Sequence, residues 1–277
     1  MLFRRLIICV LLTSAAIVHA EAGRMAVFVS IPPQKFVVDN IGGKYVQAKV
    51  MLAPGQSPET FDPSSKKIES LSGAEIYFLI GVPFERTWSK TLQDVNPDIK
   101  MVKCYSEEEG EWRNSGDYDP HIWTSPSNMK KIAEMIKDAL IDKDPERKSY
   151  YENNYNHLIS KLDTLDDYIR TTLAERRTDY FIVSHAAWTF YAREYGLKQI
   201  ALESSGRETG PKSLARILNI VKEQNIHTLF VQEQYQTPVA QALAAEMNGS
   251  IKMLDPLAEN YIENMMKVTD EIAEAVK

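Results

Sequence analysis

The chain has few cysteines and no long hydrophobic segment. Its 277 residues include two cysteines, and Cys9 lies in an N-terminal stretch that is typical of a removed targeting segment. The remaining thiol, Cys104, has no partner for an intramolecular disulfide. A single cysteine also cannot supply the several thiolate ligands of a cysteine-built zinc module. The apolar run from Leu6 to Val18 is shorter than the roughly 20 residues that a membrane span needs. A disulfide scaffold is therefore excluded, and the apolar run favours a processed targeting segment over a membrane span.

Residues 1–20 are predicted to be a cleaved signal peptide. Arg4 and Arg5 precede the apolar run, and Val18-His19-Ala20 supplies small residues at the cleavage positions, so cleavage is expected after Ala20. No cysteine follows in the manner of a lipoprotein. We expect an exported, periplasmic protein, and an uncleaved anchor is the alternative.

The chain is also short of positive charge. Its formal net charge is −6, and removal of the signal peptide takes away two arginines and no acid, which leaves 30 basic and 38 acidic residues. A nucleic-acid partner requires a basic face, so we expect none. The signatures GxxxxGK[ST], GxGxxG, HExxH, GxSxG and CxxC are all absent, so common nucleotide and hydrolase chemistries lack support.

Short apolar, β-branched runs alternate with helical stretches, as is typical of parallel sheets built from βα units. The strands are expected near 25–30, 47–52, 75–80, 99–103, 180–184, 199–202, 228–232 and 251–254. The two sets of four predict an α/β fold of two lobes, each with a roughly four-stranded parallel sheet flanked by helices. We predict an N-terminal lobe at 21–143, a linking helix at 144–175 and a C-terminal lobe at 176–277.

The segment between the two sets has the pattern of one long helix. Asp144-Pro145-Glu146 is typical of a helix start, and apolar residues then recur in steps of three and four. The pattern predicts a helix of about 30 residues, roughly 45 Å long. A rod of this kind would link the lobes rigidly and would limit hinge closure.

Four polar residues follow predicted strands, where open α/β sheets bind their ligands. Glu59 and His121 belong to the first lobe, and His185 and Asp255 belong to the second. Two imidazoles and two carboxylates that meet in a crevice between the lobes would form a site for a divalent transition metal. Asp119 could accept a hydrogen bond from the His121 ring, or it could be a turn residue before Pro120.

Four motifs occur in one order along the chain. They are GQSPETFDP, DPHIWTSP, SHAAWTFYAREYGL and LDPLAENY. Together they resemble the periplasmic metal-binding proteins of zinc and manganese ABC importers, and the similarity extends over essentially the whole mature chain. The resemblance implies that His121, His185 and Asp255 are metal ligands. Glu59 is a departure, because the family usually has histidine there, and we predict that Glu59 coordinates in its place. Glu85 resembles a glutamate near the cleft and is left outside the ligand set.

The resemblance implies a non-enzymatic carrier that captures a divalent metal outside the cytoplasmic membrane and delivers it to an ABC importer permease. Zinc is the expected metal because of His185, and Mn²⁺ or Fe²⁺ is the alternative because of the two carboxylates. We expect a monomer. Two other functions stay open, a zinc-dependent hydrolase that uses the same cluster and a metal-binding adhesin. The acidic stretch 107–119 is either a solvated loop or a means of gathering cations.

Overall fold

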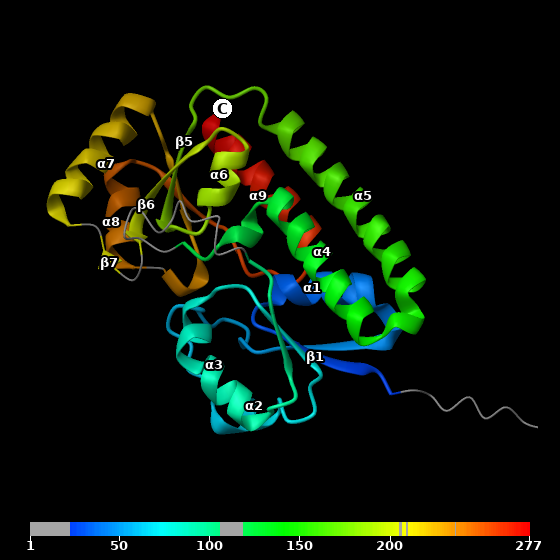
Figure 1. The fold of residues 1–277 in the computed structure, drawn as a ribbon. Coiled ribbons are helices and arrows are strands. Elements are labelled where there is room, and N and C mark those ends of the chain that lie inside the picture. Colours follow the sequence, from blue (N-terminus) through cyan, green and yellow to red (C-terminus); the bar gives the residue numbers. More distant parts are fainter. Residues whose placement is uncertain (1–22, 106–118, 205–206, 209, 236) are drawn as a thin grey trace, which may run out of the picture.

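The computed structural model describes residues 23–105, 119–204, 207–208, 210–235 and 237–277, and it contains two sheets connected by helices (Figure 1). The predicted signal peptide lies outside these residues, as does the acidic stretch except for Asp119. Within the described ranges, no helix combines the length and the apolar character that crossing a membrane requires.

The first sheet is parallel throughout, with the strand order β2-β1-β3-β4. Its strands are β1 (Met25–Val29), β2 (Val46–Val50), β3 (Ile76–Leu79) and β4 (Lys100–Lys103). All four residues of β3 are buried, as is usual for a central parallel strand with helices on both faces. Burial of both faces explains why the sequence of β3 is a continuous apolar run.

The second sheet has the order β7-β6-β5-β8-β9. Its strands are β5 (Tyr180–His185), β6 (Lys198–Ser204), β7 (Arg207–Glu208), β8 (Thr228–Val231) and β9 (Ser250–Met253). Four of them are parallel, and β7 pairs antiparallel with β6 at the edge. The eight predicted strands are confirmed to within two residues at either end. The two-residue β7 was not predicted, because it is too short to carry a pattern.

Helices cover both sheets (Figure 1). They are α1 (Pro32–Gly42), α2 (Ser65–Glu69), α3 (Pro83–Val95), α4 (Pro126–Lys143), α6 (Thr189–Glu194), α7 (Pro211–Gln224), α8 (Pro238–Glu246) and α9 (Tyr261–Val276). Helices α1, α3, α4, α7 and α8 begin with proline, whose fixed φ suits the first helical turn and whose missing N–H is not needed there.

The predicted long helix is present and slightly shorter than expected. A 3-10 turn at Pro145–Arg147 leads into α5 (Lys148–Thr172), whose 25 residues span about 37 Å. Its apolar stripe is buried at Tyr151, Leu158, Leu162, Leu165 and Ile169. The stripe packs on α1, α4 and α9, and Figure 1 shows α5 running alongside α4 and α9.

One hydrophobic core extends across the two sheets. It includes Val27 and Phe28 of β1, the buried stripe of α5, and Phe181 and Phe230 of the second sheet. A smaller core lies between the second sheet and helices α7 and α8, around Ile217, Leu229 and Leu243. The predicted lobes are thus two sheets that share one interior.

Candidate metal centre

The candidate ligands lie in the loops and strand ends at the carboxyl edges of the two sheets. Glu59 lies in the loop after β2, and His121 lies after β4, directly before a 3-10 turn at Ile122–Thr124. His185 is the last residue of β5. The structure brings these three together, with one ligand atom of each within 4.8 Å of the others.

Both histidines aim the same ring atom at one oxygen of Glu59. The Nε2 atom of His185 lies 3.1 Å from Glu59 Oε1, and the Nε2 atom of His121 lies 3.4 Å from it. Neighbouring ligand atoms around a tetrahedral zinc ion are about 3.4 Å apart, because the metal bonds are about 2.1 Å long. The spacing of the three atoms therefore suits a shared metal ion.

The opposite ring nitrogens are also held by carboxylates. Asp119 Oδ1 lies 2.8 Å from Nδ1 of His121 and also accepts a hydrogen bond from the His121 backbone N–H. The Glu203 carboxylate is hydrogen-bonded to Nδ1 of His185. Carboxylates in this position fix the orientation of a ligating imidazole and raise its basicity. Asp119 thus serves both as a turn residue and as a ring partner.

Carboxylates on both sides of each ring favour the doubly protonated imidazolium. Burial alone would lower the pKa of His121, but the hydrogen bonds and charges of Asp119 and Glu59 raise it to about 9. The pKa of His185 is raised in the same way by Glu203 and Glu59, against the effect of burial. Burial would raise the pKa of Glu59, but hydrogen bonds from the two histidines hold it well below its usual range. In this state protons occupy the positions that a metal ion would take.

The second oxygen of Glu59 is held by two hydroxyl groups. The Tyr235 hydroxyl donates to Glu59 Oε2 at 2.7 Å, and the Ser57 hydroxyl donates to the same oxygen. The Tyr235 ring also stacks on His185, with ring centroids 4.1 Å apart and an interplanar angle of 8°. Burial and the charge of Glu59 raise the pKa of Tyr235, so its hydroxyl keeps its proton.

Sequence reasoning missed Glu203 and the roles of Ser57 and Tyr235. Ser57 lies in the GQSPETFDP motif, two residues from Glu59, so its nearness could have been noticed. Glu203 and Tyr235 lie on other strands and turns, 18 and 176 residues from the groups they contact, and no spacing pattern marks them.

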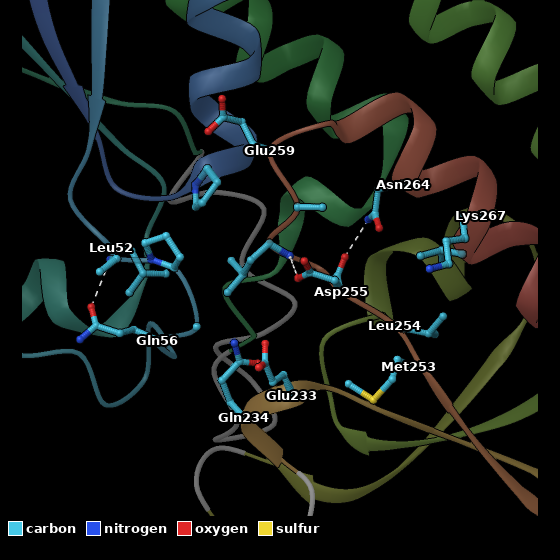
Figure 2. A pocket seen from close by; sticks show the side chains of 17 residues that line it. Leu52, Gln56, Glu233, Gln234, Met253, Leu254, Asp255, Glu259, Asn264 and Lys267 are labelled. Atoms are coloured by element: carbon cyan, nitrogen blue, oxygen red, sulfur yellow. Dashed lines mark hydrogen bonds between the residues drawn. The ribbon is translucent and has the colours of Figure 1, made fainter.

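The fourth predicted ligand, Asp255, is not part of the three-residue cluster. It lies two residues after β9, where it lines a pocket of about 430 Å³ together with Gln56 and Glu233. Figure 2 shows Asp255 between Glu233 and Asn264, with its Oδ1 atom accepting the backbone N–H of Leu257. Burial and the charge of Glu233 raise the pKa of Asp255. Its ligation of the metal stays a prediction.

A buried tryptophan connects the His121 segment to the Asp255 segment. Trp123 Nε1 donates to the backbone carbonyl of Pro256 at 2.7 Å, and the Tyr261 hydroxyl donates to the carbonyl of Trp123 at 2.9 Å. Trp123 is fully buried and its ring contacts His121, with centroids 5.1 Å apart. The DPHIW and LDPLAENY motifs therefore pack on each other.

Comparisons with known proteins match nearly the whole described chain. A family model described as "ZnuA: Zinc-uptake complex component A periplasmic" matches residues 27–275. The chain is 28% identical over 251 residues to a "Putative metal-binding protein" of Chlamydia trachomatis serovar D, which covers 90% of this chain and 91% of the relative. It is 29% identical over 227 residues to the "High-affinity zinc uptake system protein ZnuA" of Bacillus subtilis, over 75% of this chain and 70% of the relative.

The fold is matched by solved structures as well. A structure titled "Crystal structure of ZnuA" superposes with a TM-score of 0.87 at 33% sequence identity, and it covers 92% of this chain and 100% of the other. The agreement confirms the expected arrangement of two parallel sheets and a long helix.

Proposed function

Because the chain belongs to the ZnuA family of zinc-uptake components, we propose that it captures a divalent metal outside the cytoplasmic membrane and delivers it to an ABC importer. Zinc is the proposed cargo, with Mn²⁺ or Fe²⁺ as the alternative. The observation that carries the proposal is the convergence of two imidazole Nε2 atoms on one carboxylate oxygen. Each ring is held from its far side by a further carboxylate, as ligating histidines usually are.

The proposed ligands are Glu59, His121, His185 and Asp255. The first three already lie at ligand spacing, and Asp255 would complete a four-coordinate site from the adjoining pocket. The imidazole nitrogen ligands favour zinc, whereas the carboxylate ligands are also suited to manganese or iron. A metal ion would also offset the repulsion between the negative charges of Asp255 and Glu233.

A carrier needs to hold its cargo without converting it. A fourth carboxylate ligand would take the position that a catalytic zinc site leaves open for water, so the proposed set favours binding over hydrolysis. The protein is further proposed to be monomeric, to lose its signal peptide after Ala20, and to dock on a membrane permease that takes up the metal.

Metal analysis of the purified protein tests this function. Protein prepared without added metal is loaded with one equivalent of zinc, and native mass spectrometry is combined with elemental analysis. The variant His121→Ala is compared with His157→Ala, a matched control, since His157 is exposed on α5.

We expect one zinc ion in the wild-type protein and in His157→Ala, and none in His121→Ala. Retention of stoichiometric zinc by His121→Ala would contradict the proposed site. Loss of zinc uptake by cells that lack the protein, restored by the wild-type chain but not by His121→Ala, would support delivery to an importer.

A further inference from the structure

The two oxygens of Glu59 have different neighbours. Oε1 faces the Nε2 atoms of His121 and His185, at 3.4 and 3.1 Å. Oε2 accepts hydrogen bonds from the hydroxyls of Tyr235 and Ser57. One oxygen is thus directed to the metal position and the other is held by the protein.

The group that holds Oε2 is itself well fixed. Tyr235 lies in a 3-10 turn at Glu233–Tyr235, after β8 of the second sheet, while Glu59 comes from a loop of the first sheet. Its ring lies flat on His185, and its hydroxyl is 2.9 Å from Ser57 Oγ. Ser57 in turn accepts the backbone N–H of Glu59 at 3.2 Å. The Glu59 carboxylate is therefore held by hydrogen bonds from Ser57, in its own loop, and from Tyr235, which follows a strand of the second sheet.

This arrangement affects how many bonds Glu59 can offer. A carboxylate that gives a single oxygen to the metal keeps the coordination number low, whereas one that gives both raises it. Zinc prefers four ligands in a tetrahedron, and manganese prefers about six, mostly oxygen. A hydroxyl that retains Oε2 therefore favours zinc over manganese at the same site.

We infer that Tyr235, assisted by Ser57, is a specificity-determining residue that restricts Glu59 to single-oxygen coordination and so selects zinc against manganese. The inference rests on the proposed metal-binding function. Tyr235 acts through Glu59 and is a positioning residue, not a ligand. A histidine at position 59, which the family usually has, could offer the metal one nitrogen only. Tyr235 restricts Glu59 to one ligand atom in the same way.

The test compares zinc and manganese dissociation constants of the wild-type protein with those of Tyr235→Phe and Ser57→Ala. Tyr235→Phe keeps the ring that stacks on His185, so the fold is preserved. Tyr168→Phe is the matched control, because the Tyr168 hydroxyl also donates to a carboxylate, that of Asp270, on helices α5 and α9. Cobalt(II) serves as a spectroscopic probe, since four-coordinate cobalt absorbs visible light much more strongly than five- or six-coordinate cobalt.

In Tyr235→Phe we expect the preference for zinc over manganese to fall about tenfold, the usual effect of one hydrogen bond to a charged group. The visible absorption of bound cobalt should weaken at the same time, and Ser57→Ala should show a smaller change of both in the same direction. Tyr168→Phe should match the wild-type protein.

The inference would be overturned if Tyr235→Phe kept the wild-type preference and cobalt spectrum, or if it weakened both metals by one factor. Those results would leave the proposed function intact as long as the wild-type protein binds zinc and His121→Ala does not. Failure of the wild-type protein to bind either metal would instead remove the proposed function.

Discussion

His185 and Glu203 are register partners on the adjacent strands β5 and β6, and the Glu203 carboxylate is hydrogen-bonded to Nδ1 of His185. The sheet itself therefore places the carboxylate behind the ring. Removing its charge should leave the ring in place but make it a weaker ligand. We expect Glu203→Gln to weaken zinc binding about 10- to 100-fold, as is usual for partners of ligating histidines.

A competition titration against a zinc chelator measures this loss. Glu75→Gln is the control, since Glu75 lies beside β3, where it pairs with Lys143 on the surface. An unchanged zinc affinity in Glu203→Gln would mean that the contact does not tune the ligand.

Zinc affinity should depend on pH, because the metal replaces protons. Without metal, each imidazole of His121 and His185 has a carboxylate next to both of its nitrogens. These carboxylates raise the pKa of His121 to about 9. Below that pH a zinc ion must displace a proton from Nε2. We expect the apparent affinity to rise from pH 6 to 9, by about tenfold per pH unit for each displaced proton.

Calorimetry in two buffers of different ionisation enthalpy counts the protons released on binding. The count should be between one and two near pH 7, and in His121→Ala the release should disappear with the binding. An affinity that stays constant from pH 6 to 9 would show that the rings are already neutral.

The stability of the metal-free protein should change in the opposite direction. The pKa of His121 in the folded protein lies above its ordinary value of 6.5. The stabilisation from the protonated ring is therefore complete below about pH 6.5 and is lost as the pH rises through about 9. We expect a loss of up to about 3 kcal/mol over this range.

Urea unfolding at pH 6.5 and pH 9 measures the effect. His121→Gln is the comparison, because it cannot be protonated, and the difference in unfolding free energy between the two proteins should shrink at pH 9. A difference that is the same at both pH values would contradict a protonated His121 in the metal-free state.

Glu85 should be a structural residue. Glu85 is 4% exposed, and its carboxylate accepts hydrogen bonds from the backbone N–H groups of Ile80 and Gly81, at 2.9 and 2.7 Å. It thereby closes the turn between β3 and α3. We expect Glu85→Ala to lower the free energy of unfolding by at least about 2 kcal/mol, because two buried N–H groups lose their acceptor.

Thermal or urea unfolding tests Glu85→Ala, with exposed Glu69→Ala on α2 as a control that should stay within about 0.5 kcal/mol of wild type. Zinc stoichiometry should not change, since Glu85 is outside the three-residue cluster. Loss of zinc without loss of stability would place Glu85 among the metal-binding residues instead.

The strands and the clustering of three candidate side chains could be predicted from the sequence for two reasons. The inner strands β3 and β8 are continuous buried runs, as expected where helices cover both faces of a sheet, and polar residues at strand ends meet at one edge of a parallel sheet. Glu59, His121 and His185 followed from this rule together with the motifs around them.

The contacts that tune the site could not be predicted in the same way. Glu203 reaches His185 through strand pairing, and Tyr235 reaches Glu59 across the two sheets. Such contacts depend on the register and on the packing of distant segments, which leave no local pattern. Asp255 follows its strand as predicted, yet its side chain is turned to Leu257 N–H and the adjoining pocket.

The long helix should limit how far the two halves move when metal binds. The buried stripe of α5 packs on α4, on α1, which contacts β1 and β2 of the first sheet, and on α9, which contacts β5 of the second. Hinge closure requires a few residues that can absorb large backbone changes, whereas α5 is continuous over 25 residues. We therefore expect zinc to leave the radius of gyration of the protein unchanged within experimental error.

Small-angle X-ray scattering of the metal-free and zinc-loaded protein measures this quantity. His121→Ala with zinc is the control, because it should give the curve of the metal-free protein. A fall in the radius of gyration that appears with wild type and not with His121→Ala would reveal a metal-driven closure. In that case the shared core along α5 would have to slide or open, because α5 makes up most of the connection between α4 and β5.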